Sequence, residues 1–222
     1  MADTNLTPTV RRVDRVIWVG LGLSFPLVLL ALVLAALRLQ SPGRPLPVYG
    51  QVAEFTLTNQ FGQAVSLGDL RGHPWVADII FTRCPGPCLA MTGQMRDLQQ
   101  APRSATGARL VTLTTDPDFD TPPILKSYAE RFGADTNRWL FLTGTKKAIA
   151  SLAIDSLKLT ALPKKPEERD SPNDLFVHST IFVLVDKNGR LRGVYETTGA
   201  GTNPAAVKSQ ILGALRRLER ER

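Results

Sequence analysis

Soft metal-binding and redox-active side chains are scarce in this chain. Its 222 residues include two cysteines and two histidines. The cysteines, Cys84 and Cys88, lie so close in the sequence that a disulfide between them would close too short a loop to stabilise a fold. No other cysteine is available, so the pair is either a redox couple or two thiolate ligands for a metal. A structural zinc site needs four protein ligands, and beside the two cysteines and one histidine the sequence shows no fourth, which argues against such a site.

Two further features that the sequence lacks reduce the number of possible functions. The net charge is +7, but no aromatic residues interleave with the short basic clusters, such as those at residues 164–165 and 216–217. This pattern argues against a nucleic-acid-binding surface. The chain contains no internal repeat, and 43% of its residues are hydrophobic, which supports a core. We therefore expect one ordinary domain with an appendage, and no nucleic-acid partner.

The appendage is predicted at the N-terminus, where residues 16–37 form a run without a charged side chain. A helix of this length spans roughly 33 Å, close to the thickness of a bilayer core. The run is long for a signal peptide, lacks a good cleavage site and is followed by no cysteine for lipid attachment, so we expect an uncleaved transmembrane anchor. Arginines before it favour residues 1–15 in the cytoplasm and the long C-terminal part in the periplasm or its extracytoplasmic equivalent. Residues 38–47, rich in proline, are predicted to be an extended linker.

Residues 48–222 alternate between strand-like and helix-like segments. The order predicts an α/β fold, with a central mixed sheet and helices on both faces. Residues 158–177 are polar and proline-rich, and we expect them to form an exposed, mobile loop that leads into His178. The expected strands are 54–58, 64–67, 75–81, 109–115, 139–143, 181–186 and 190–196, and the expected helices are 89–100, 122–132, 145–154 and 203–222.

The cysteine motif, C-P-G-P-C at residues 84–88, lies where a predicted strand passes into a predicted helix. The positive end of a helix dipole favours thiolates at this place. The spacing is one residue longer than the C-x-x-C of thioredoxin-type oxidoreductases. Positions i and i+4 lie on one helix face, roughly 5–6 Å apart at Cβ, which suits two sulfurs on one metal ion and still permits a disulfide. Pro85 and Pro87 require the first half of the motif to be a loop.

A third soft ligand is offered by His178, at the mouth of a predicted strand. Two thiolates and one imidazole suit Cu(I), and with a fourth weak donor they suit Cu(II). The other histidine, His73, lies in a turn before a strand and is interpreted as a surface residue. Met91 and Met95 continue the helix face of the cysteines, and a row of sulfurs would suit copper transfer. We interpret both as core residues, because methionines on the inner face of a helix fill a core.

Three segments resemble the Sco/SenC family of membrane-anchored copper-binding proteins. The sequence F-T-R-C-P-G-P-C at 81–88 is similar to the family's F-x-x-C-P-x-x-C, and T-T-D-P-D-F-D-T-P at 114–122 is similar to its S-x-D-P-x-x-D-T-P. The sequence H-S-T at 178–180, followed by a predicted hairpin, resembles its histidine-bearing strand. The segments occur in the family's order, and the similarity runs from about residue 50 to the C-terminus. Gly86 and Leu89 depart from the family pattern, which commonly has Asp and Pro there.

The resemblance implies a thioredoxin-like fold for residues 48–222. It also implies copper binding by Cys84, Cys88 and His178, and help in assembling the binuclear copper site of cytochrome c oxidase. The leading hypothesis is therefore a copper chaperone or metallation factor outside the membrane. Its partner would be the copper-binding subunit of the oxidase, or another copper donor or acceptor.

Two other functions are compatible with the cysteine motif. A thiol–disulfide oxidoreductase that reduces the cysteines of an apo-oxidase subunit would use Cys84 and Cys88 as its redox pair and would not need His178. A thiol peroxidase would share the fold, but the close second cysteine and the distant histidine argue against it.

Overall fold

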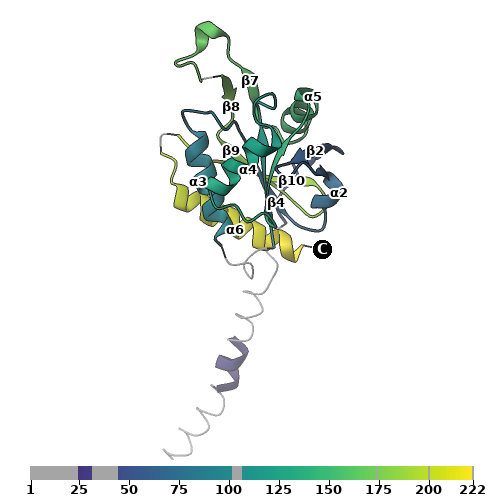
Figure 1. The fold of residues 1–222 in the computed structure, drawn as a ribbon. Helices are drawn as coiled ribbons and strands as arrows, with labels where there is room; N and C mark the ends of the chain where they lie inside the picture. Colours follow the sequence, from purple (N-terminus) through teal and green to yellow (C-terminus); the bar gives the residue numbers. More distant parts are fainter. Residues whose placement is uncertain (1–24, 32–44, 102–106, 174, 200, 222) are drawn as a thin grey trace, which may run out of the picture. The chain divides into compact units, whose positions relative to one another are not determined.

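The computed structural model describes residues 25–31, 45–101, 107–173, 175–199 and 201–221 (Figure 1). The chain divides into two compact units, Met1–Gly43 and Arg44–Arg222. In the first unit, residues 25–31 are helical. The predicted N-terminal segment 1–15 and most of the predicted anchor and linker lie outside the described residues. Within the described ranges, no helix is both long and apolar enough to cross a bilayer.

The second unit is built on a mixed sheet, which has eight strands in the described part of the chain. The central strands β4, β5 and β6 run parallel to one another, and all other neighbours in the sheet are antiparallel. The order across the sheet is β1 (Gly50–Gln51), β10 (Arg190–Glu196), β9 (Ile181–Val185), β4 (Trp75–Ile80), β5 (Arg109–Thr114), β6 (Trp139–Thr143), β2 (Thr56–Asn59) and β3 (Ala64–Ser66).

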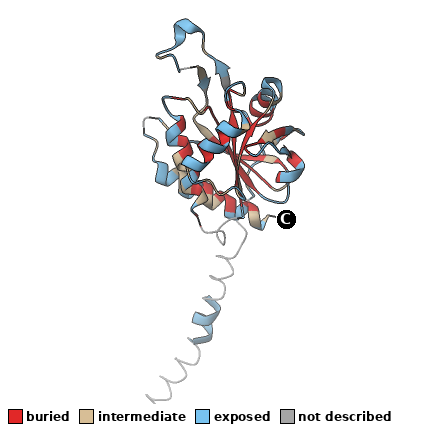
Figure 2. Ribbon diagram, viewed as in Figure 1, coloured by how far each residue is buried: buried red, intermediate tan, exposed pale blue. Residues whose placement is uncertain are grey.

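Helices cover both faces of this sheet, and Figure 2 shows the buried residues between the layers. One face carries α3 (Cys88–Gln99), α4 (Pro122–Arg131) and α6 (Pro204–Arg220). The other carries α2 (Leu67–Leu70) and α5 (Lys146–Ala150), which continues as a π-helical turn, Ser151–Ser156. This arrangement confirms the predicted α/β architecture with a mixed sheet and flanking helices.

The apolar run of β4 explains why this strand is central. Its side chains alternate between the two cores, with Val76 and Ile80 under α3 and with Trp75, Ala77 and Ile79 on the opposite face. All of these side chains are buried, as expected for a parallel strand covered by helices on both sides.

The helix starts follow the expected capping chemistry. Thr121 is extended before Pro122, the first residue of α4. At α6, the Asn203 side chain accepts hydrogen bonds from the backbone N–H groups of Ala205 and Ala206. These caps place the first turns of the helices within a residue or two of their predicted positions.

Residues 158–177 differ from the prediction of a plain loop. They include β7 (Ala161–Pro163) and most of β8 (Phe176–His178), which pair antiparallel as a separate two-stranded sheet. The polar tip between them contains a short 3-10 helix, Pro166–Glu168. The strands form because each contains apolar side chains, and Phe176 packs edge-on against Phe81 with 5.2 Å between ring centroids.

Candidate metal centre

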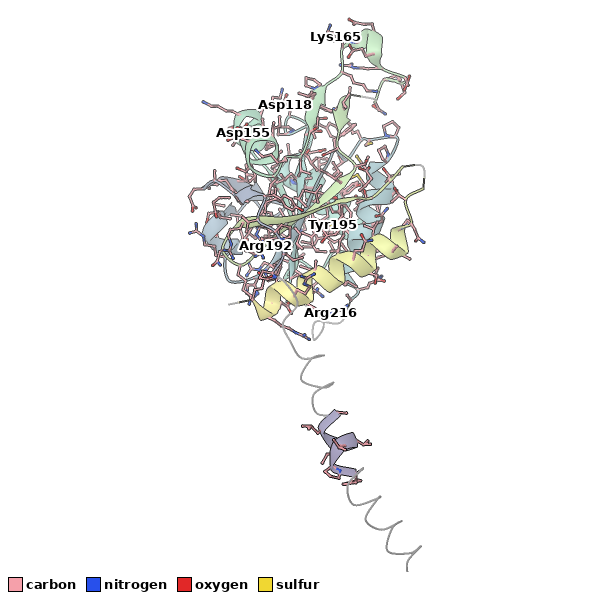
Figure 3. The ribbon with its side chains drawn as sticks, turned by 180° about the vertical axis from the view of Figure 1, so that it is seen from behind. Asp118, Asp155, Lys165, Arg192, Tyr195 and Arg216 are labelled. Atoms are coloured by element: carbon pink, nitrogen blue, oxygen red, sulfur yellow. The ribbon has the colours of Figure 1, made fainter. Side chains whose placement is uncertain are left out.

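The two cysteines lie at the edge of the sheet where the parallel strands end. Cys84 follows β4 in a turn, and Cys88 is the first residue of α3. Residues 116–120 follow β5 and reach the same edge, because parallel neighbours end together. We call residues 81–88, residues 116–120 and the β7–β8 hairpin the thiol end. Figure 3 shows Asp118 and Lys165 toward this end of the domain and Arg192 farther toward the other.

The cysteines are present as thiols and are not joined in a disulfide. Cys84 is 7% exposed and Cys88 is fully buried. A hydrogen bond between the two thiols, together with burial, raises the pKa of Cys88. Cys88 is therefore held as a neutral thiol, and it has to lose its proton before it can bind a metal.

The loop after β5 holds the residues that precede Cys84. The Asp120 carboxylate accepts hydrogen bonds from Thr82 N at 3.1 Å, from Thr82 Oγ1 at 2.5 Å and from Thr114 Oγ1 at 2.5 Å. Asp120 is fully buried, and burial raises its pKa despite these bonds. The backbone beside Cys84 is thus fixed to the neighbouring strand by a buried carboxyl group.

Arg83 makes a second connection between the two loops. Its guanidinium pairs with Asp116 at 2.5 Å and lies over the Phe119 ring, 4.0 Å from the centroid. The charge of Arg83, directly before Cys84, is therefore neutralised by Asp116, and its guanidinium stacks on Phe119.

The β7–β8 hairpin forms the opposite wall of the site. A cavity of about 440 Å³ lies between the hairpin and the cysteine motif, and its lining includes Cys84, Pro85 and Val177. His178 is the last residue of β8, directly after Val177. Its side chain lies outside the described residues. Among the side chains that are described, no three His, Cys, Asp or Glu residues come together as a metal-binding group.

The structure therefore brings two of the three predicted ligands into contact and places the strand of the third beside them. Of the remaining candidates, His73 is exposed, as expected for a surface residue. Met91 and Met95 are fully buried within the hydrophobic core under α3. Their interpretation as core residues is confirmed.

One buried acid near the site was missed by the sequence reasoning. Asp78 on β4 is fully buried, accepts a hydrogen bond from Thr112 Oγ1 at 2.7 Å, and contributes to the raised pKa of Cys88. The signal was a single acidic residue inside the apolar run W-V-A-D-I-I. A strand that is apolar at all other positions puts such a residue into the core.

The chain was compared with known proteins. A family model described as SCO1/SenC matches residues 48–215. A protein of Bacillus subtilis (strain 168) named SCO1 protein homolog is 37% identical over 147 residues, which cover 65% of this chain and 73% of that protein.

Two solved structures have the same fold. BsSco, described as a member of the Sco family of cytochrome c oxidase assembly proteins with a disulfide switch, is 32% identical with a TM-score of 0.63, covering 78% of this chain and 98% of its own. Copper-bound ScoI of Bradyrhizobium japonicum is 22% identical with a TM-score of 0.58, covering 75% of this chain and 100% of its own. The latter likeness concerns the fold alone.

Proposed function

The chain belongs to the SCO1/SenC family, and from this membership we propose that it is a copper metallation factor that binds the ion through Cys84, Cys88 and His178. The observation that carries the proposal is the contact between two thiols at the start of α3, beside the strand that ends in His178. The recipient we propose is the copper-binding subunit of cytochrome c oxidase, where a binuclear copper centre is assembled.

The donor chemistry fits copper. Thiolates are soft ligands that select Cu(I), and an imidazole suits copper as well. The two thiols are already in hydrogen-bonding contact, so both sulfurs can reach one ion with little rearrangement. Copper is the cargo here, and the protein's task is to hold it and to release it to a recipient.

Three features of the chain favour the binding of copper. The N-terminal end of α3 stabilises the negative charge that develops on Cys88 when its proton leaves. Cys84 lies in a turn between two prolines and a strand, and its sulfur is the more exposed of the pair. The hairpin pairs with no strand of the main sheet in the described part of the chain, which supports a movement of β8 that brings His178 toward the sulfurs.

Copper binding by ligand variants of the full chain tests this proposal. We expect one copper ion per chain. Cys84→Ser, Cys88→Ser and His178→Ala should each reduce affinity by more than the roughly 10- to 100-fold that loss of an outer-shell partner costs. His73→Ala is the matched control, because this second histidine is exposed and should leave the affinity unchanged. Wild-type affinity in the His178→Ala protein would contradict the three-ligand site.

A thiol–disulfide reductase is the second candidate, and the contact between the two thiols favours it as well. In this reaction Cys84 and Cys88 would give up two electrons and two protons to a disulfide of the apo-subunit and become a disulfide themselves. His178→Ala separates the candidates, because a pure reductase keeps its rate and a copper donor does not. We also propose that the Cys84–Cys88 disulfide empties the metal site, since it removes the two thiolates that would bind Cu(I).

We further propose that residues 16–37 anchor the chain in the membrane, with the domain on the extracytoplasmic side. The support is the long uncharged run and the arginines before it. A C-terminal alkaline phosphatase fusion should be active. An inactive phosphatase fusion together with an active cytoplasmic reporter would reverse the orientation.

A further inference from the structure

Exposed apolar side chains are concentrated around the thiols. In the described part of the second unit, ten large hydrophobic side chains are exposed, and five of them belong to the elements that meet at the thiol end. We call these five the apolar rim, which consists of Leu89, Phe119, Ile124, Leu162 and Val177.

The rim surrounds Cys84 on both sides. Phe119 lies under the guanidinium of Arg83, the residue before Cys84. On the hairpin side, Val177 lines the same cavity as Cys84, and Leu162 is its direct partner across the two strands. The exposed prolines of the cysteine motif lie between these two walls.

Two helix starts complete the rim. Leu89 follows Cys88 in the first turn of α3, and Ile124 is in the first turn of α4. The two helices are held together by a buried hydrogen bond of 2.9 Å between the Thr92 and Tyr128 hydroxyls.

The charges near the rim cancel one another. Arg83 pairs with Asp116, and Lys146 pairs with Asp118. The hairpin tip, residues 164–170, carries three basic and three acidic side chains. A surface without net charge gives little electrostatic steering, so any docking there depends on apolar contact.

The burial of the sulfurs determines what can act on them. Cys88 is fully buried and Cys84 is only 7% exposed. A recipient therefore has to place its own ligands against Cys84, and its neighbouring surface then covers the rim.

We propose that the apolar rim is the docking surface for the protein that accepts copper, and that the matching surface of this acceptor is apolar and uncharged around a pair of thiols. The inference rests on the proposed function and specifies its partner. Cu(I) passes from the sulfurs of Cys84 and Cys88 to the acceptor thiolates without a change in oxidation state. The protons that the acceptor thiols release end on the two cysteines left behind.

A double substitution on the rim tests the surface. Ile124→Ser/Leu162→Ser removes two rim side chains that are 38% and 54% exposed and that do not line the cysteine cavity. The matched control is Phe61→Ser/Val194→Ser, which removes side chains that are 44% and 48% exposed elsewhere on the domain.

The full copper-loaded chain is mixed with the reduced apo form of the copper-binding domain of a cytochrome c oxidase, and the rate of copper transfer is measured. The affinity of the two apo proteins for each other is measured in parallel. We expect the rim variant to lower both by about tenfold or more, as loss of two interface anchors does, and the control variant to lower neither. Transfer to a small Cu(I) chelator should be the same for all three proteins, because a chelator does not need the rim.

The outcomes separate the inference from the proposed function. A wild-type chain that binds copper but transfers none to the acceptor contradicts the metallation function itself. If the wild type transfers copper and the rim variant does so at the same rate, the rim is not the docking surface and the function stands. Affinity that falls steeply between about 0.02 and about 0.5 M salt would show a charged interface and overturn the apolar one. Leu162→Ser alone is a second rim variant with the same direction of effect, for the case that the double variant folds poorly.

Discussion

Two buried aspartates, one at each end of the domain, have pKa values shifted in opposite directions. At the thiol end, Asp120 is hydrogen-bonded by two hydroxyls and one backbone N–H, and burial raises its pKa. At the other end, burial acts on Asp186 in the same sense, but hydrogen bonds from the backbone and from Arg192 and Arg190 outweigh it and lower the pKa. The buried carboxyl group at the thiol end is therefore held by uncharged hydrogen-bond donors, whereas the one at the opposite end belongs to a buried ion network.

The buried network joins the N-terminal and C-terminal segments of the second unit. Arg192 is 2% exposed, and its guanidinium donates to Asp186, to Glu221 and to the carbonyl oxygens of Leu46 and Pro47. We call these five residues the Arg192 clamp. Because β4 starts beside β9 near Asp186 and ends just before the cysteines, the clamp and the thiols are separated by about one strand length, roughly 20 Å.

The location of the clamp has a consequence for function. Residues 46–47, where the chain enters the domain, are fixed at the end opposite to the thiols. The entry point is held by hydrogen bonds to a buried arginine, whereas the thiol end has exposed apolar side chains and a hairpin outside the main sheet. Residues 46–47 therefore lie at the end of the second unit opposite to the surface that we propose for docking.

Breaking the clamp should have the largest effect on stability. Arg192→Met removes the buried cation that pairs with the buried Asp186 and with the partly exposed Glu221, and loss of such a partner costs about 3 to 5 kcal/mol of unfolding free energy. Arg190→Met is the matched control, because Arg190 pairs with the same Asp186 but is 37% exposed, and such pairs contribute about 1 kcal/mol or less. Urea unfolding of both variants measures the difference.

Copper binding by the same proteins sharpens the comparison. If the two ends are independent, folded Arg192→Met protein binds one copper ion with unchanged affinity. Equal losses of stability in the two arginine variants would contradict the distinction between the buried and the exposed cation.

A smaller loss of stability is expected when a hydrogen bond to Asp120 is removed. Thr82→Val removes one of the three donors to the buried Asp120 carboxyl, which costs about 1 to 3 kcal/mol. The neighbouring Cys84 should also become easier to modify, because its backbone loses one connection to β5. Thermal unfolding and the rate of thiol alkylation measure the two effects, with Thr56→Val on the exposed start of β2 as a control. An alkylation rate equal to that of the wild type would mean that Asp120 does not hold the loop.

The two ends should also respond to pH in opposite directions. The pKa of Asp186 is lowered, so its contribution to stability is present above its usual value and is lost as the pH falls. The pKa of Asp120 is raised, so stability decreases as the pH rises from the usual value through the raised one. Unfolding free energies are measured between about pH 3 and about pH 7. Asp186→Asn should remove the loss of stability as the pH falls, and Asp120→Asn should remove the decrease of stability as the pH rises. Identical pH profiles for the two variants would contradict the opposite effects of Asp186 and Asp120 on stability.

The sequence predicted the thiol end better than the clamp, and the reason is physical. A cysteine pair after an apolar strand depends on local pattern alone, so Cys84, Cys88 and the start of α3 were placed within a residue. The clamp joins Leu46 to Glu221, which are 175 positions apart, and no local pattern indicates such a contact. The hairpin was missed because its two three-residue strands are separated by a polar tip that resembles a loop.

The smallest effect is expected from Met91→Leu, which tests whether sulfur chemistry at the thiol end is confined to the cysteines. Met91 is fully buried in the core under α3, so a volume-conserving change should cost less than about 1.5 kcal/mol. Copper stoichiometry and affinity should equal those of the wild type, because a side chain that fills the core is not available to an incoming ion. Met95→Leu, one turn farther along the same helix face, is the control for general loosening of the core. If Met91→Leu weakened copper binding and Met95→Leu did not, the metal site would extend beyond the cysteines along α3 into the core.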